Sequence, residues 1–109
     1  MEQQALIKWS NLVDEINGKL VHVPNGGFRC FLEAAKFKRL GVRKGFPDLF
    51  LPIPRGGFHG LFIELKRKGS KPNDDQMNWL NYLESNGYAA TWCEGWVMAK
   101  IVIEKYLKL

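Results

Sequence analysis

The spacing of apolar residues along the chain predicts four helices. In four segments apolar side chains recur at intervals of three and four residues, the spacing that places them on one face of a helix. These segments cover residues 2–17, residues 29–40, a stretch from about Asn73 to Gly87, and a stretch from about Trp96 to Tyr106. Gly18 and Gly41 directly follow the first two segments and are suited to ending a helix.

Shorter apolar runs between these segments predict strands. The runs cover residues 20–24, 45–51, 60–68 and 88–93. The second and third runs are joined by a loop rich in proline and glycine, so we expect a hairpin. The last run follows a helix, so we expect it to lie parallel to the strand that it joins. The fold class is therefore α/β, a small mixed sheet flanked by helices, and 109 residues fit a single domain, residues 1–109.

Acidic residues interrupt the apolar hairpin. Asp48 lies in its first strand, and Glu64 and Lys66 lie near the end of its second strand. Since residues two apart in a strand point to the same face, Glu64 and Lys66 share a face, whereas Ile63 and Leu65 point toward the expected core. A hairpin of this length can bring Asp48 opposite or beside Glu64. Two carboxylates and an ammonium would then converge in an apolar neighbourhood, where charge must be paired or bind a metal.

Charge is distributed unevenly along the chain. The net charge is +5, but residues 36–71 contain ten basic residues and only two acidic ones, Asp48 and Glu64. A basic segment indicates a polyanionic partner. An acid pair at its centre would repel a phosphate unless a divalent cation lay between them, so the pattern predicts metal-dependent phosphodiester chemistry. The alternative is a structural Glu64–Lys66 ion pair on a solvated basic face, which explains the charge but not the position of the two acids.

Several classes of protein are not favoured by the sequence. No apolar run approaches the ~20 residues that a membrane-spanning helix needs, and the chain opens directly into a helical pattern instead of a signal peptide. Cys30 and Cys93 are isolated and do not form a zinc motif. We expect both thiols to be buried in a cytoplasmic protein.

Three polar residues outside the hairpin have open interpretations. Glu2 lies in the first turn of the first helix, where the helix dipole favours an acid, but it would face the site if that helix end lay over the sheet. Glu33 on the second helix is a rival for any third acidic role. Gln76 either forms a capping box with Asn73 or reaches back toward Lys66 or a phosphate.

A set of short motifs follows in order along the chain. They are Pro24-Asn25-Gly26-Gly27-x-Arg29, Lys38-x-x-Gly41-Val42, Gly45-x-Pro47-Asp48, Gly60-Leu61-Phe62-Ile63-Glu64-Leu65-Lys66, Gln76, and the segment from Gly87-Tyr88 to Cys93-x-Gly95-Trp96. Together they resemble the PD-(D/E)xK nuclease core, and more specifically the VRR-NUC family in its stand-alone, minimal form. The resemblance runs from near Glu2 to about Leu107 and implies a restriction-endonuclease-like fold.

The resemblance also implies a chemistry, that of a Mg²⁺- or Mn²⁺-dependent DNA endonuclease. Minimal members of the family resemble Holliday-junction resolvases and are thought of as dimers, and larger relatives carry the module at the end of a DNA repair nuclease. The implied roles are Asp48 and Glu64 as metal ligands with the Leu65 carbonyl, Lys66 as the catalytic lysine, Gln76 as a supporting helix residue, and Glu2 as the acid of the first helix.

The expected partner is DNA, contacted mainly through its backbone. The candidate contact residues are Asn25, Arg29, Arg43, Lys44, Arg67, Lys68 and Lys71. We find no base-reading helix, so we expect recognition of structure, with a branched or four-way junction as substrate and a homodimer supplying two matched sites. The alternatives are a non-catalytic module that binds DNA or RNA without metal, and a nuclease that acts on flaps, single strands or RNA.

Overall fold

The structure is a computed structural model that describes residues 2–24 and 31–109. Its helices are α1 (Glu2–Ser10), a short 3-10 helix η1 (Asp14–Ile16), α2 (Phe31–Arg39), α3 (Asp74–Ser85) and α4 (Gly95–Leu107). Its strands are β1 (Val21–His22), β2 (Leu49–Leu51), β3 (Leu61–Lys66) and β4 (Ala89–Glu94). Within these ranges no helix has the length and apolar character needed to cross a membrane.

The four strands form one mixed sheet in the order β1-β2-β3-β4. β1 pairs with β2, and β2 with β3, in antiparallel orientation. β4 follows the α3 crossover and pairs with β3 in parallel orientation, which confirms the expectation from the sequence. In the hairpin Leu49 lies opposite Ile63, so Asp48, one residue before β2, is level with Glu64.

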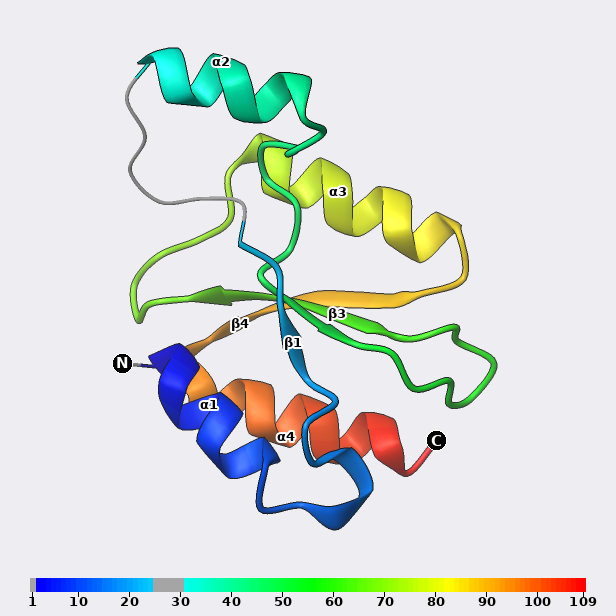
Figure 1. Cartoon of the computed structure of the whole chain (residues 1–109). Coiled ribbons are helices and arrows are strands. Elements are labelled where there is room, and N and C mark those ends of the chain that lie inside the picture. The colour runs from blue at the N-terminus through cyan, green and yellow to red at the C-terminus, as the bar shows by residue number, and fades with distance from the viewer. Residues whose placement is uncertain (1, 25–30) are drawn as a thin grey trace.

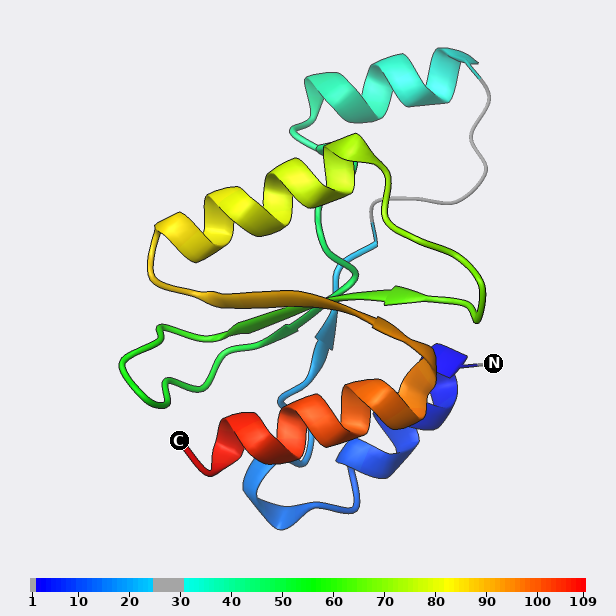
Figure 2. The same ribbon diagram turned by 180° about the vertical axis from the view of Figure 1, so that it is seen from behind.

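Helices cover both faces of the sheet (Figures 1 and 2). α1 and α4 lie together against one face, whereas α3 covers the other face and α2 lies beyond α3. The α1 and α4 side contains a mainly aliphatic core made of Leu6, Ile16, Leu20, Leu49, Leu51, Leu61, Ile63, Cys93, Ala99, Ile103 and Tyr106. The α3 side is aromatic, because the Phe46 ring contacts the rings of Phe62 and Trp79, and Phe50 stacks on Phe62.

As a result, β3 is buried on both of its faces. Ile63 belongs to the aliphatic core and Leu65 packs against it, as the sequence pattern predicted. The opposite face of β3, which carries Phe62 and Glu64, is also buried, with exposed fractions of 6% and 3%. The site that the sequence predicts on this face therefore lies under α3.

The first helix is shorter than the apolar spacing predicted. α1 ends at Ser10 instead of reaching residue 17. The buried Ser10 hydroxyl donates to the Ile7 carbonyl, and the N–H groups of Leu12 and Val13 bond three residues back, which tightens the chain into a turn. Ile16 lies in η1 and is fully buried. Its spacing from the apolar residues of α1 therefore reflects burial in the core and not a continuous helix.

The prediction that Gly41 ends the second helix is confirmed. Gly41 has a φ of +93°, and its N–H donates to the Lys38 carbonyl while the N–H of Val42 donates to the Phe37 carbonyl. These two bonds form a Schellman motif, the common way to satisfy the last carbonyls of a helix.

The two cysteines were expected to be buried thiols. Cys93 is free and buried on β4, and its burial raises the pKa of the thiol to about 11. A thiol with so high a pKa stays protonated and unreactive at neutral pH. Cys30 lies outside the described residues.

Gly45 holds the loop before β2 against the start of α3. Its φ is +85°, and a Cβ atom at this position would lie 2.8 Å from the Asp75 Cβ. This close approach of two backbones is possible only without a side chain. Phe46, the next residue, then packs between Phe62 and Trp79 and leads the chain toward Asp48.

We predict that Gly45→Ala destabilises the protein more than Gly57→Ala. Gly57 has a φ of +86° but open space around it, so both changes incur about 1 kcal/mol of backbone strain. Only the methyl group at residue 45 would collide with Asp75, which adds a loss on the order of 1–3 kcal/mol. Urea denaturation of the two variants measures the difference, and equal losses would contradict the prediction.

Candidate active site

The predicted catalytic residues come from three elements that meet at one end of the sheet. Glu64 and Lys66 lie on β3, Asp48 directly precedes β2, and Gln76 lies in the first turn of α3. The structure brings these four side chains together through the contacts described below. The fifth predicted residue, Glu2, has a different environment.

Asp48 is held by backbone groups of the neighbouring strands. Its Oδ2 accepts a hydrogen bond of 2.9 Å from the N–H of Leu65. Its carbonyl accepts a bond of 2.7 Å from the N–H of Val23, and the Nδ1 of His22 lies 3.1 Å from the same oxygen. These bonds hold the carboxylate beside Glu64, as the hairpin pattern predicted, and they bring the backbone of Leu65 to the site.

Glu64 is a buried carboxylate with a perturbed pKa. Its Oε2 accepts a bond of 3.2 Å from the Nε2 of Gln76 and lies 3.7 Å from the Nζ of Lys66. Burial, followed by the charge of the adjacent Asp48, raises the pKa of Glu64 from 4.5 to about 8, and Lys66 opposes the shift. Negative charge at this position is therefore unfavourable in the absence of a further cation.

The structure confirms the capping box of Gln76 and places its free amide on Glu64, a partner that was not predicted from the sequence. The Oε1 of Gln76 accepts a bond from the N–H of Asn73, and its own N–H donates to the Asn73 side chain, both at 2.9 Å, so the capping box is present. Its Nε2 remains available and donates to Glu64, not to Lys66. One amide thus caps α3 and orients the buried carboxylate.

Glu2 caps another helix. Its Oε2 accepts a bond of 2.5 Å from the N–H of Trp96 in the first turn of α4, where an anion is favourable. Within the described part of the chain, no three His, Cys, Asp or Glu residues lie close enough together to hold a metal ion. Glu2 therefore does not join Asp48 and Glu64 in a three-acid cluster. The side chain of the alternative, Glu33, lies outside the described part, so a third acid stays a prediction from the resemblance.

Basic residues flank the acid pair along the chain. Arg43 and Lys44 precede Asp48, and an exposed group follows Lys66. This group consists of Arg67, Lys68 and Lys71. The Nζ of Lys44 lies 3.5 Å from Asp75 at the surface, and Lys68 lines a hollow of about 360 Å³ together with Glu2 and Trp96. The remaining two candidate DNA contacts, Asn25 and Arg29, lie outside the described residues.

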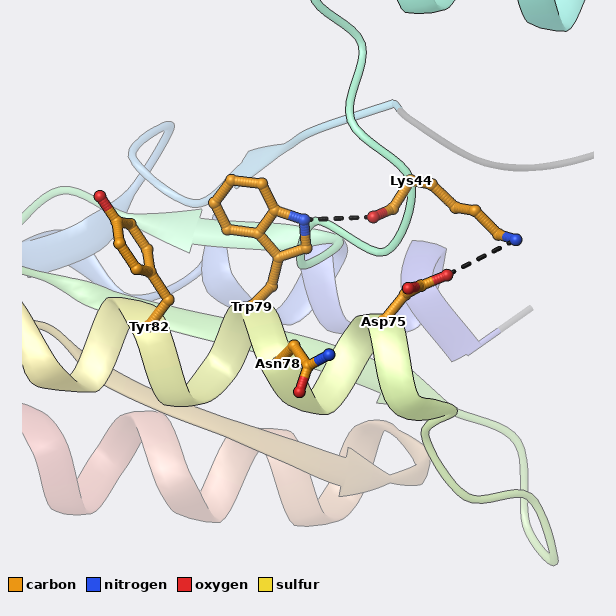
Figure 3. A pocket seen from close by; sticks show the side chains of 5 residues that line it. All are labelled: Lys44, Asp75, Asn78, Trp79 and Tyr82. Carbon is orange, nitrogen blue, oxygen red and sulfur yellow. Dashed lines mark hydrogen bonds and ion pairs between the residues drawn. The ribbon is translucent and has the colours of Figure 1, made fainter.

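An aromatic pocket next to this site was not predicted from the sequence. Trp79 and Tyr82 project from α3 over a pocket of about 450 Å³, which Lys44, Asp75 and Asn78 also line (Figure 3). The available signal was the placement of two aromatic residues three positions apart, beside the buried positions Leu80 and Leu83.

The donor groups of the site fit a hard divalent cation. Asp48 and Glu64 supply carboxylate oxygens, which Mg²⁺ and Mn²⁺ prefer to nitrogen or sulfur. The raised pKa of Glu64 reflects burial and acid–acid repulsion that a cation would relieve. The local electrostatics therefore favour a cation at this position.

The fold and the site define a class of protein. It is a small mixed α/β domain with Pro-Asp before one strand of a hairpin and Glu-x-Lys at the end of the other. The chain belongs to the VRR-NUC family of nucleases, because the sequence model of the VRR-NUC domain matches residues 2–96. This confirms the family resemblance.

Solved structures support the same assignment. A structure described as a "VRR_NUC domain protein" is 35% identical, covers 98% of this chain and 85% of its own, and superposes with a TM-score of 0.88. A structure described as "VRR_NUC domain" is 20% identical, covers 97% of this chain and 98% of its own with a TM-score of 0.58, and supports the fold alone. The search of curated proteins found no match.

We predict that Glu64→Gln reduces the pH dependence of folding stability. Because folding raises the pKa of Glu64 to about 8, its contribution to stability is fully present below its ordinary pKa of 4.5 and is lost as the pH rises toward 8. In EDTA at pH 8 the variant should be more stable than the original protein, by on the order of 1–3 kcal/mol. Urea denaturation between pH 5 and about 8.5 tests this.

The matched control is Glu84→Gln, which changes an exposed glutamate on α3 and should leave the pH dependence unaltered. If Glu64→Gln also left the pH dependence of folding stability unaltered, the Glu64 carboxylate would not be the group responsible for it.

Proposed function

We propose that the protein is a divalent-metal-dependent DNA endonuclease that cuts branched DNA, four-way junctions in particular. The observation that supports this best is the acid pair of Asp48 and Glu64, with Lys66 beside it, within a segment that is otherwise strongly basic. A buried glutamate beside a half-buried aspartate is unfavourable for packing alone. Membership of a nuclease family supports a catalytic use for it.

Asp48 and Glu64, with the Leu65 carbonyl, would hold a Mg²⁺ or Mn²⁺ ion. When bound, the ion supplies Lewis-acid stabilisation of the phosphate and a lowered pKa of the attacking water. The hydrogen bond from the Leu65 N–H to Asp48 fixes one carboxylate, and the Gln76 amide fixes the other. Both ligands are therefore oriented before the ion arrives.

Lys66 acts on the phosphate and on the water. Its ammonium lies 3.7 Å from Glu64 and its side chain is 19% exposed, so it is confined to the neighbourhood of the acid pair. There it orients the water and neutralises the charge that develops on the phosphate during attack. The DNA backbone is held by Arg43 and Lys44 on one side of the acid pair and by Arg67 and Lys68 on the other. Contacts to the backbone position the DNA without reading its base sequence.

The substrate and the assembly are linked by symmetry. A four-way junction presents two equivalent strands to cut, and one chain offers one acid pair, so we propose a homodimer with two-fold symmetry. Val97, Met98 and Ile101 are exposed along α4. They form an apolar helix face of the kind that subunit interfaces cover.

We predict that the protein cuts a labelled four-way junction in Mg²⁺ or Mn²⁺ and not in EDTA. Asp48→Asn removes a ligand and Lys66→Ala removes the cation that neutralises the phosphate, so each should lower the cleavage rate by roughly a hundredfold or more. Lys19→Ala, an exposed change outside the basic segment, should cut like the original protein.

Four further substrates, tested in parallel with the junction, distinguish the alternatives. They are a linear duplex, a flap, a single strand and an RNA duplex. Equal cutting of the linear duplex would keep the nuclease and refute selection of junctions. Tight binding without cutting in either metal would refute the nuclease and favour a non-catalytic module.

The proposed dimer predicts a mass in solution of twice the 12.5 kDa of one chain. Light scattering at micromolar concentration measures it. Ile101→Glu places a charge on the apolar face of α4 and should yield single chains that remain folded by circular dichroism. A mass of one chain for the original protein would contradict the dimer.

A further inference from the structure

A second candidate site lies on α3, one helical turn beyond Gln76. It is the pocket of about 450 Å³ lined by Lys44, Asp75, Asn78, Trp79 and Tyr82, which we call the aromatic pocket. The two aromatic side chains rise from the same side of the helix, and the Lys44 side chain extends past Asp75 at one end (Figure 3). Its volume lies within the range of pockets that bind small organic groups.

Trp79 is a fixed wall of the aromatic pocket. Its Nε1 donates a hydrogen bond of 3.1 Å to the carbonyl of Lys44, and its ring meets the Phe46 ring edge to face with centroids 5.0 Å apart. The indole therefore has its orientation set before any ligand binds. Because the indole N–H already donates to Lys44, the Trp79 side chain can offer its ring surface to a ligand but no further hydrogen bond.

Tyr82 completes a right-angled corner. Its ring lies at 90° to that of Trp79, with centroids 5.8 Å apart, and the residue is 60% exposed. Apart from its edge-to-face contact with Trp79, much of the Tyr82 ring is therefore accessible to a ligand. A planar heteroaromatic group can stack on one ring of the corner while its edge meets the other.

The polar groups of the aromatic pocket match a nucleotide. The Asn78 amide has donors and an acceptor suited to the edge of a base. The Lys44 side chain is 85% exposed, with its ammonium 3.5 Å from Asp75, and it can reach a backbone phosphate. The pocket therefore offers stacking surfaces, an edge contact and, at one end, a lysine that is paired with an acid.

The aromatic pocket adjoins the acid pair. Gln76 donates to Glu64, and Trp79 lies three residues further along α3, a rise of about 4.5 Å. Phe46 contacts both Trp79 and Phe62, and Phe62 is two residues before Glu64 on β3. A DNA strand at the acid pair would therefore pass close to the corner formed by Trp79 and Tyr82.

We propose that the aromatic pocket receives an unpaired nucleobase of the bound DNA, stacked on the Tyr82 ring with its edge toward Trp79, close to the phosphate that is cut. The inference rests on the proposed function in so far as the ligand is a DNA strand. It adds a basis for selectivity, because a base can enter the pocket only where it is released from its pair, as at a branch point. A continuous duplex offers no such base without disruption.

The test measures binding in EDTA, so that it does not depend on cleavage. Fluorescence anisotropy compares three junctions, one fully paired, one with an unpaired thymine at the branch point, and one with an abasic nucleotide in place of that thymine. The original protein should bind the thymine junction roughly tenfold more tightly than the abasic one, as expected for one stacked base.

Tyr82→Ala should abolish this preference, whereas Tyr82→Phe, which keeps the ring, should retain it. Asn81→Ala is the matched control, because Asn81 is exposed on the same helix and does not line the pocket. Trp79 is left in place because its ring also packs against Phe46, and its removal would disturb the fold.

The outcomes separate this inference from the proposed function. If Tyr82→Ala weakened binding to the thymine and abasic junctions equally, or had no effect, the base-stacking role would be refuted, whatever the cleavage assays showed. If the protein cut no DNA but kept a preference that depends on Tyr82, the nuclease proposal would fail and the base-binding pocket would stand.

Discussion

The rest of the structure depends on one constraint, a carboxylate placed on a strand that is buried on both faces. β3 runs through the middle of the sheet and has aliphatic packing on one side and aromatic packing on the other. Glu64 on this strand must find its partners inside the protein, because water is almost excluded from it. Asp48 lies directly before β2, Lys66 lies on β3 itself, and Gln76 lies on α3 above. Three segments thus each contribute one group to the environment of a single side chain.

The two sides of the sheet have different compositions, and the difference bears on the site. The α1 and α4 side is filled mainly by aliphatic side chains, which lack polar atoms. The α3 side is filled by rings in edge and stacked contact. Trp79 and Tyr82 continue this aromatic packing to the surface of α3, where their rings meet at 90°. The polar site and the aromatic pocket both occur on this side.

Much of this arrangement could be predicted because it is encoded in local spacing. The alternation in the hairpin and its length were enough to place Asp48 level with Glu64, and the helical crossover was enough to make β4 parallel to β3. The capping role of Gln76 was predictable because the capping box is a local pattern, but its bond to Glu64 was not predicted. Contacts between distant segments were not predictable in this way. Nothing near Glu2 indicates that its carboxylate meets the N–H of Trp96.

The end of α1 shows a second reason why a prediction from the sequence can differ from the structure. Apolar spacing reports which side chains are buried, and Ile16 is buried, but a 3-10 turn can satisfy the same spacing as another turn of α-helix. The burial of both faces of β3 was also missed in part. The strand pattern predicted a core on the side of Ile63, and only the packing of α3 shows that Phe62 lies in a second one.

The double use of the Gln76 side chain makes the first turn of α3 and the buried carboxylate a single cooperative unit. If the helix start unwinds, the amide leaves Glu64, and if Glu64 turns away, the amide loses one of the bonds that hold it at the cap. Local opening of this region should therefore be all or none, and amide hydrogens of the turn should exchange together with the release of the carboxylate. A helix with the same apolar face but another residue at this position would pack equally well on the sheet and leave Glu64 without its orientation.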